Sequence, residues 1–377
     1  MFAPKQTELI VEDIFRSELV RRRRDALAFF DTQITLNLSK IPPDISRKAV
    51  RNIELFFGFT ARHFDSLRDL SEQAAEAYQE NQAVCLATSG STGEPKQIRY
   101  SKEMMEIEAV GVGKYFKDSK RLITLTPRQH LYGLSFAVWF PAYYPLAVTN
   151  LPPLPLQPWH KLLREGDVLC GFPLFWEYFL KAGNTFPDGV TAVTSTAPCP
   201  KGLFMRLKQA KAKQVIELYG ATETGGIGVR YNEDEPFQIN DFWDISFESS
   251  TPLISRKGIE GRLPFPDEAQ FVPPRGVFPL KRMDRIVQVA GVNVSLEYVE
   301  KKIMEYPAVK ECRVRLMRPE EGRRLKAFIV LKEGFDKTEL PQIRKFLAEN
   351  LTSHQMPRAF AFGETLPVNS MGKLIDW

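Results

Sequence analysis

The chain has 377 residues, of which 44% are apolar and 26% are charged, and its formal net charge at pH 7 is +5. A chain of this length can bury a large core and usually folds as two or three units. The modest positive charge suggests anionic ligands, and it excludes the concentrated basic surface of a dedicated nucleic-acid binder.

The first eighty residues have the pattern of amphipathic helices. Apolar residues recur at three- and four-residue spacing over 9–30 and 46–78, and the breaker KIPPDIS separates the two stretches. We therefore expect residues 1–82 to form a helical N-terminal region of a larger domain. The arginine run 21–24 is interpreted as a solvated helix face rather than a binding patch.

From Ala83 onward, short apolar runs end in clusters of Gly, Ser and Pro and alternate with helical stretches. This texture indicates α/β layering, with ligands at the strand ends, over residues 83–282. Strand and helix patterns after residue 282 predict a small α+β unit over 283–377. The Pro-rich segment 151–159 is expected to be an irregular connection.

The uncharged stretch 131–148 is long enough to raise the question of a membrane span, but Pro141 and Pro145 interrupt it. We expect a buried helix or strand there.

The N-terminus lacks the basic start and apolar core of a secretory signal. The cysteines lie far apart and without nearby His in metal spacing, so neither a zinc site nor a disulfide framework is indicated. A cytoplasmic protein fits best. The four cysteines are Cys85, Cys170, Cys199 and Cys312.

A loop rich in glycines and hydroxyls follows the first predicted strand. Its glycines allow backbone N–H groups to approach phosphate, its hydroxyls add donors, and its lysine adds positive charge. It does not match the Walker pattern, because no Ser or Thr follows the lysine, so a γ-phosphate kinase or ATPase is disfavoured. The loop residues that would contact phosphate are Thr88, Ser89, Gly90, Ser91, Thr92, Gly93 and Lys96.

The order Ser-Gly-Ser-Thr-Gly-x-Pro-Lys resembles the phosphate loop of the adenylate-forming superfamily, which includes acyl- and aryl-CoA ligases, firefly luciferase and the adenylation domains of peptide synthetases. The downstream segment Tyr219–Glu223 resembles that family's aromatic-Gly-x-Thr-Glu motif. The resemblance implies that Tyr219, next to Gly220, stacks on adenine. It also implies that Thr222 touches the α-phosphate and that Glu223 holds Mg²⁺, a cation that prefers carboxylate and phosphate oxygens.

Three further positions follow from the same resemblance. His130 stands in a His-x-x-Gly-Leu segment and would border the carboxylate pocket. Ala197 belongs to a small-residue turn against the adenine, in which the family's usual Gly is replaced. Asp267 lies at the family's spacing before Arg282, and its carboxylate would accept the ribose hydroxyls; a surface turn is the alternative.

The C-terminal part carries the remaining motifs. By resemblance, Arg282 binds ribose, Asp284 is the hinge of the small domain, and the loop around Gly291 approaches the thiol substrate. Lys373, in a Pro-x-x-x-x-Gly-Lys motif, would bridge the attacking carboxylate and the α-phosphate and stabilise transition-state charge. The implied fold is a large N-terminal α/β domain with a small mobile α+β C-terminal domain.

The expected function is ATP-dependent activation of a carboxylic acid through an acyl-adenylate, followed by transfer to the thiol of coenzyme A. One alternative acceptor is the phosphopantetheine of an acyl carrier protein, and another alternative is an inactive nucleotide-binding partner protein. The region before the phosphate loop is shorter than is common in the family, so self-association is possible. Aromatic residues around the expected pocket suit an aryl or fatty acid, although core packing explains them equally well. They are Tyr132, Phe136, Trp139, Phe172, Phe175 and Trp176.

Overall fold

The computed structural model describes residues 4–22, 36, 38–88, 96–151, 158–248, 251–282, 286–289, 292–322 and 324–367. Two compact units are present: the larger contains residues 1–87 and 97–281, and the smaller contains residues 88–96 and 282–377. The larger unit is α/β and the smaller is rich in strands. The predicted fold class, a large N-terminal α/β domain and a small C-terminal α+β domain, is confirmed.

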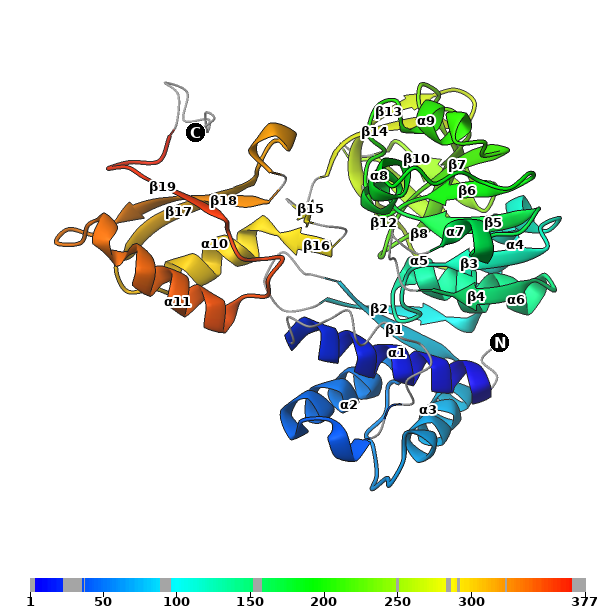
Figure 1. The fold of residues 1–377 in the computed structure, drawn as a ribbon, viewed down its shortest axis with the longest axis horizontal. Helices are drawn as coiled ribbons and strands as arrows, with labels where there is room; N and C mark the ends of the chain where they lie inside the picture. Colours follow the sequence, from blue (N-terminus) through cyan, green and yellow to red (C-terminus); the bar gives the residue numbers. More distant parts are fainter. Residues whose placement is uncertain are drawn as a thin grey trace. The chain divides into compact units, whose positions relative to one another are not determined.

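Helices come first in the larger unit and pack against one another (Figure 1). They are α1 (Pro4–Arg22), the short η2 (Leu38–Lys40), α2 (Pro43–Phe57) and α3 (Leu67–Asn81). Helix α2 ends at Gly58, whose φ of 73° suits a residue without Cβ. Helix α3 begins with a capping box, in which Ser66 and Asp69 each bond the other's backbone N–H. The side chains of the arginine run 21–24 lie outside the described residues.

The next elements alternate between strands and helices, as the short apolar runs predicted. They are β1 (Ala83–Thr88), β2 (Lys96–Ser101), α4 (Lys102–Gly113), η3 (Lys114–Phe116), β3 (Arg121–Thr124), α5 (Leu131–Leu134), η4 (Ser135–Trp139), α6 (Phe140–Tyr143), β4 (Ala147–Asn150), α7 (Trp159–Leu162), β5 (Asp167–Gly171), α8 (Pro173–Lys181), β6 (Thr191–Thr194), α9 (Leu203–Gln209) and β7 (Gln214–Ala221). Strands β1 and β2 form a two-stranded sheet of their own.

The stretch 131–148, expected to be buried helix or strand, forms α5, η4, α6 and the start of β4, and residues 133–140 within it are buried. Within the described part of the chain, no helix combines the length and apolar character that crossing a membrane requires. Most of the Pro-rich connection, residues 152–157, lies outside the described residues.

A nine-stranded sheet forms the centre of the larger unit, in the order β13-β14-β9-β8-β7-β6-β5-β3-β4. Strands β4, β3, β5, β6 and β7 are parallel, and β8 turns back antiparallel to β7. Two apolar cores lie on opposite faces of the parallel half. One joins α1–α6 to the sheet through residues such as Leu122 and Cys170. The other joins α7–α9 to the sheet through Ile123 and Leu169.

The antiparallel half surrounds a smaller core that includes Phe237, Trp243 and Phe265. The strands that follow β7 in the larger unit were not predicted one by one from the sequence. They are β8 (Gly225–Arg230), β9 (Phe237–Ile239), β10 (Trp243–Ser246), β11 (Leu253–Arg256), β12 (Leu263–Pro264), β13 (Asp267–Val272) and β14 (Gly276–Arg282). Strands β10, β11 and β12 form a separate three-stranded sheet.

The smaller unit has its own core, built around Val299, Val314, Ile329 and Leu347. Strands β15 and β16 form an antiparallel hairpin, while β17 and β18 are antiparallel and β19 is parallel to β18. Its elements are β15 (Ile286–Val289), β16 (Val292–Ser295), α10 (Leu296–Met304), β17 (Val309–Leu316), η5 (Pro319–Glu321), β18 (Leu325–Leu331), η6 (Lys337–Glu339), α11 (Leu340–Asn350) and β19 (Ala359–Phe362).

Candidate active site

The site segments predicted from the sequence follow neighbouring parallel strands. Pro127–His130 comes after β3, Ser195–Ala197 comes after β6, and Tyr219–Glu223 covers the end of β7. Strands β3, β5, β6 and β7 pair in parallel, so their carboxyl ends meet at one edge of the sheet. The structure therefore gathers these three segments along the edge where α/β sheets bind their ligands.

The connections change face between β3 and β5, which are neighbours in the sheet. The helical segment after β3 packs into the core that contains Leu122, whereas α8, which follows β5, packs into the core that contains Leu169. Such a topological switch point is the usual ligand position in an open α/β sheet. The segments that border it are Pro127–His130 after β3 and Phe172 after β5.

His130 is exposed and stands immediately before α5. Its N–H donates to the carbonyl of Pro127 at 3.1 Å, and its carbonyl accepts from the N–H of Leu134 at 2.8 Å. Gly133 lies so close to the carbonyls of Thr126 and Pro127 that a Cβ atom there would overlap them. The glycine of the His-x-x-Gly-Leu segment thus packs α5 onto the loop that carries His130.

Helix α1 fixes this loop from the other side, a contact that the sequence did not reveal. Asp13 Oδ2 accepts from the backbone N–H of Arg128 at 2.8 Å and from its guanidinium at 2.9 Å. Burial raises the pKa of Asp13, and the charge of Arg128 opposes that rise. The residues lie 115 positions apart. No local sequence signal pairs an aspartate on one helix with an arginine in so distant a loop.

Tyr219 and Asp267 meet although 48 residues separate them: the tyrosine hydroxyl donates to Asp267 Oδ2 at 2.6 Å. Asp267 is 7% exposed, so it is not the surface-turn aspartate of the alternative interpretation. Its other oxygen, Oδ1, is buried and has no hydrogen-bond partner among the described residues. The Tyr219 ring packs on Phe237 and Phe265 and remains partly exposed. One carboxylate oxygen is therefore available beside an aromatic ring.

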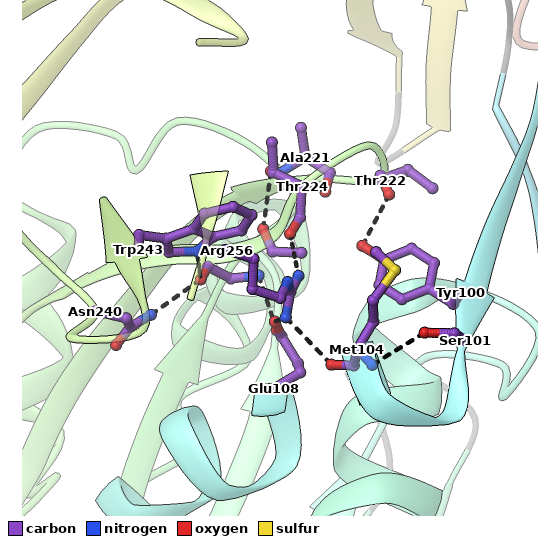
Figure 2. Close-up of polar contacts among 12 residues, drawn as sticks. Tyr100, Ser101, Met104, Glu108, Ala221, Thr222, Thr224, Asn240, Trp243 and Arg256 are labelled. Carbon is purple, nitrogen blue, oxygen red and sulfur yellow. Dashed lines mark hydrogen bonds and ion pairs between the residues drawn. The ribbon is translucent and has the colours of Figure 1, made fainter. Parts of the chain in front are cut away.

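Thr222 and Glu223 are partly exposed in the turn between β7 and β8, and Figure 2 shows Thr222 in this turn. Thr224 is buried, and its hydroxyl accepts from the N–H of Ala221 at 3.2 Å, which closes the turn. A Cβ atom on Gly220 would overlap the carbonyl of Gly225, so the glycine of the motif permits the close approach of the two strands. The role of Gly220 in this structure is therefore to let the backbones of β7 and β8 pack closely.

The turn after β6 is anchored by Ser195, whose hydroxyl donates to the carbonyl of Leu218 at 3.0 Å. Thr196, at the centre of the turn, has a φ of 75°, a value that β-branched residues rarely adopt. Ala197 follows and is partly exposed. The bond to Leu218 holds the turn beside the β7 segment that contains Tyr219.

Several predicted residues lie outside the described part of the chain. These are Ser89, Gly90, Ser91, Thr92, Gly93, Asp284, Gly291 and Lys373. Only the backbone of three further residues is described, at the end of β1, the start of β2 and the end of β14. These are Thr88, Lys96 and Arg282. Their assignments stay predictions.

The six aromatic residues predicted near the pocket divide into two groups. Phe136, Trp139, Phe175 and Trp176 are at most 2% exposed and belong to the cores on the two faces of the sheet. For these four, core packing is the correct interpretation. Tyr132 and Phe172, one from each side of the switch point, are partly exposed.

Among the described residues, no three or more His, Cys, Asp or Glu side chains cluster in a way that could hold a metal ion. A lone carboxylate such as Glu223 still fits Mg²⁺, because this ion keeps several waters and commonly binds one or two carboxylates together with substrate phosphates. The donor set here suits a metal that arrives with a nucleotide.

The sequence matches two family models. Residues 30–244 match the AMP-binding enzyme family, and residues 298–373 match the AMP-binding enzyme C-terminal domain. A 4-coumarate–CoA ligase from Cereibacter sphaeroides is 34% identical over 77% of this chain and 70% of that protein. A 4-coumarate–CoA ligase from Halorhodospira halophila is 32% identical over 81% of this chain and 78% of that protein.

The fold is also similar to solved structures. An o-succinylbenzoate CoA synthetase from Bacillus subtilis has a TM-score of 0.70 at 19% identity, covering 87% of this chain and 75% of that one. A malonyl-CoA ligase structure has a TM-score of 0.62 at 19% identity, covering 75% of this chain and 71% of that one.

The chain therefore belongs to the AMP-binding enzyme family, and the predicted membership of the adenylate-forming superfamily is confirmed. The predicted class of enzyme, an AMP-forming acid–thiol ligase that activates a carboxylic acid with ATP, is confirmed with it. The alternatives, a carrier-protein ligase and an inactive nucleotide-binding partner protein, are not favoured.

Proposed function

We propose that this enzyme activates an aromatic carboxylic acid with Mg-ATP and transfers the aryl acyl group from its adenylate to coenzyme A. Relatives named 4-coumarate–CoA ligase align over at least 70% of their lengths at 30% identity or more. A relative named for a fatty acid, a long-chain-fatty-acid–CoA ligase from Bacillus subtilis, is 21% identical over 60% of its length. This difference favours an aryl acid over a fatty acid.

The nucleotide part of the proposal rests on the contact between Tyr219 and Asp267. Tyr219 would stack on adenine, with the turn at Ala197 on the other side of the base. The tyrosine hydroxyl occupies only one oxygen of Asp267, which leaves buried Oδ1 to accept from a ribose hydroxyl. An unpartnered buried carboxylate oxygen is costly unless a ligand satisfies it. Arg282 is the proposed second ribose contact.

The phosphates would be bound by three groups of residues. The glycine-rich loop from Thr88 to Lys96 would surround them with backbone N–H groups, hydroxyls and the lysine charge. Thr222 would donate to the α-phosphate, and Glu223 would bind Mg²⁺. The metal, when bound, would offset the negative charge that develops on pyrophosphate.

In the first half-reaction, a carboxylate oxygen of the acid attacks the α-phosphorus of ATP and the bond to pyrophosphate breaks. The acid would lie at the switch point next to His130, between the partly exposed rings of Tyr132 and Phe172. Lys373 would stabilise the charge that accumulates between the attacking carboxylate and the α-phosphate. The products are an aryl-adenylate and pyrophosphate.

In the second half-reaction, the thiolate of coenzyme A attacks the acyl carbon and AMP leaves. We propose that the small domain, residues 283–377, rotates about Asp284 between the two steps and brings the Gly291 loop to the thiol. Within the large domain, residues 1–82 would form a helical region and residues 83–282 the ATP- and acid-binding core. Such a movement would allow one site to serve two reactions in sequence.

The proposal is tested by measuring pyrophosphate release from ATP with cinnamic, benzoic, fatty and amino acids, with and without coenzyme A. We expect release with aryl acids, and an aryl-CoA thioester and AMP only when coenzyme A is present. Asp267→Asn should raise the KM for ATP about tenfold, since charge-assisted hydrogen bonds contribute about 1.5–3 kcal/mol, without changing the preferred acid. Absence of release with every acid would contradict the proposal.

A further inference from the structure

The turn Ala221–Gly226, which carries Thr222 and Glu223, is held mostly by side chains from other elements (Figure 2). Its own side chains supply little of this support, apart from the bonds of the Thr224 hydroxyl. The outside contacts come from β2, α4 and β11 and also from Asn240 and Trp243, all within the larger unit. Their residues are not part of any motif identified in the sequence.

Tyr100 provides the contact from β2. Its side chain is fully buried, and its hydroxyl donates to the carbonyl of Thr222 at 3.0 Å. Burial raises the pKa of Tyr100, so the hydroxyl keeps its proton and acts as a donor at neutral pH. Strand β2 directly follows the predicted phosphate loop in the chain. Tyr100 thus links β2, which follows the predicted phosphate loop, to the carbonyl of Thr222 in the second predicted nucleotide-binding segment.

Glu108 and Arg256 provide the contacts from α4 and β11. Both side chains are 3% exposed and form an ion pair with an N–O distance of 3.3 Å. Glu108 Oε1 accepts from the N–H of Gly226 at 2.7 Å, and Arg256 Nη2 donates to the carbonyl of Thr224 at 2.6 Å. The pair therefore binds one donor and one acceptor of the turn, and each ion is partnered despite its burial.

The two glycines that close the turn make these contacts possible. Gly225 has a φ of 81°, and a Cβ atom there would lie 2.6 Å from Glu108 Oε2 and 3.0 Å from Arg256 Nη2. A Cβ atom on Gly226 would lie 2.9 Å from Glu108 Oε1. Any larger residue would push the ion pair away from the backbone. The two glycines and the ion pair therefore fit together as one arrangement.

The far end of the turn is held in the same way. The carbonyl of Gly226 accepts from the indole N–H of Trp243 and from the amide of Asn240, each at 3.0 Å. The guanidinium of Arg256 lies over the Trp243 ring, 4.6 Å from its centroid. These contacts fix the carbonyls of Thr222, Thr224 and Gly226 and the N–H of Gly226.

We propose that Tyr100, Glu108 and Arg256 are positioning residues that hold the Ala221–Gly226 turn in the conformation that presents Thr222 and Glu223 to Mg-ATP. This inference rests on the proposed function. None of the three side chains needs to touch the nucleotide, since each acts through the backbone of the turn. Preorganised contacts of this kind reduce the reorganisation that binding and catalysis would otherwise require.

The test compares Tyr100→Phe with Tyr144→Phe. Each change removes one hydroxyl that donates to a backbone carbonyl at 3.0 Å, from Tyr100 to Thr222 and from Tyr144 to Val110 on α4. The Val110 carbonyl lies outside the turn. Tyr144→Phe should lose less stability than Tyr100→Phe, because the Tyr144 bond is exposed whereas Tyr100 is fully buried, so the melting temperature of each variant without ligand is measured as a reference for folding. The decisive measurements are the Kd of Mg-ATP in the absence of acid and the kcat of adenylate formation.

Tyr100→Phe should lower the ratio of kcat to the Kd of Mg-ATP about fivefold in total, through a higher Kd, a lower kcat or both, as expected for one hydrogen bond of about 1 kcal/mol. The KM for the acid should stay unchanged. Tyr144→Phe should leave all three values as in the wild type. Equal values for the two variants would overturn the inference. An inactive wild type would instead overturn the proposed function, so the two failures are distinguishable.

Arg256→Lys tests the ion pair without leaving Glu108 unpaired. A lysine keeps the charge but cannot span Glu108 and the Thr224 carbonyl with one planar fork. The ratio of kcat to the Kd of Mg-ATP should fall by about the same factor as in Tyr100→Phe, since one hydrogen bond to the turn is lost. A folded Arg256→Lys enzyme with the wild-type ratio would refute the positioning role of Arg256.

Discussion

Thr196 has a backbone conformation that is unfavourable for a β-branched residue. Its φ of 75° lies in the left-handed region, where the branched Cβ crowds the backbone. The adenylate-forming superfamily, which this turn resembles, usually has a glycine in it, and no glycine is present in the turn here. The surrounding contacts, such as the bond from Ser195 to Leu218, keep the turn in place despite the strain.

We expect Thr196→Gly to stabilise the enzyme by about 1 kcal/mol. Relief of a left-handed threonine contributes about 1–2 kcal/mol, and the greater freedom of glycine in the unfolded chain offsets part of it. The free energy of unfolding in urea measures the change. Thr191→Gly, at the start of β6 in the same segment, is the matched control and should destabilise the enzyme. Destabilisation by both changes would show that Thr196 is not strained.

The sequence predicted residues that belong to contiguous motifs, and it missed residues that act through distant contacts. Tyr219, Thr222 and Glu223 were predicted because five consecutive residues carry the motif. Glu108 and Arg256 were not predicted, because they lie 148 positions apart and because each looks in the sequence like an ordinary charged residue on the surface. Burial and pairing are tertiary properties, so no local spacing encodes them.

At the scale of elements, the parallel strands were predictable because each is a short apolar run that ends in a Gly, Ser or Pro cluster. The strands from β8 to β14 were harder, since several of them, such as β12 and β13, are mostly exposed or half-buried and lack a continuous apolar run. Strand β19 was missed in the same way, as all four of its side chains are only half-buried. Such strands are specified by their partners more than by their own sequences.

In the smaller unit, Glu321 joins the connection between β17 and β18 to both strands. It accepts from Arg315 in a bidentate pair at 2.6 and 2.9 Å, and from Lys326 at 3.3 Å. These bonds, with the Arg315 side chain as the largest cause, hold the pKa of Glu321 well below its usual range. A lowered folded-state pKa means that the ionised carboxylate stabilises the fold above the unfolded-state pKa.

We therefore expect Glu321→Gln to lower the melting temperature at pH 7. The difference from the wild type should shrink as the pH falls below the usual glutamate pKa of about 4.3 toward the lowered folded-state value, because the wild-type carboxylate then also becomes neutral. Thermal melts from pH 7 to pH 2 measure this. Glu320→Gln, whose exposed partner Arg318 is 3.8 Å away, should have little effect at any pH. A difference that is constant with pH would contradict the assignment.

At the scale of the whole molecule, the two units divide the proposed residues between them. Tyr219, Thr222, Glu223 and Asp267 belong to the larger unit, whereas Lys373 belongs to the smaller. Under the proposal, adenylate formation needs residues of both units, and thioester formation needs the units in a different arrangement. Loss of Lys373, which is proposed to act in the first step, should affect that half-reaction only.

We expect Lys373→Ala to reduce adenylate formation by at least about a hundredfold, the usual effect of removing a group that stabilises transition-state charge. Thioester formation from a supplied aryl-adenylate and coenzyme A should remain near the wild-type rate, because no phosphate is attacked in that step. Stopped-flow measurements of the two half-reactions separate the effects. Lys345→Ala, an exposed lysine on α11 of the same unit, is the control and should leave both rates unchanged. Equal loss of both half-reactions in Lys373→Ala would mean that one arrangement of the two units serves both steps, and the proposed rotation about Asp284 would then have no role.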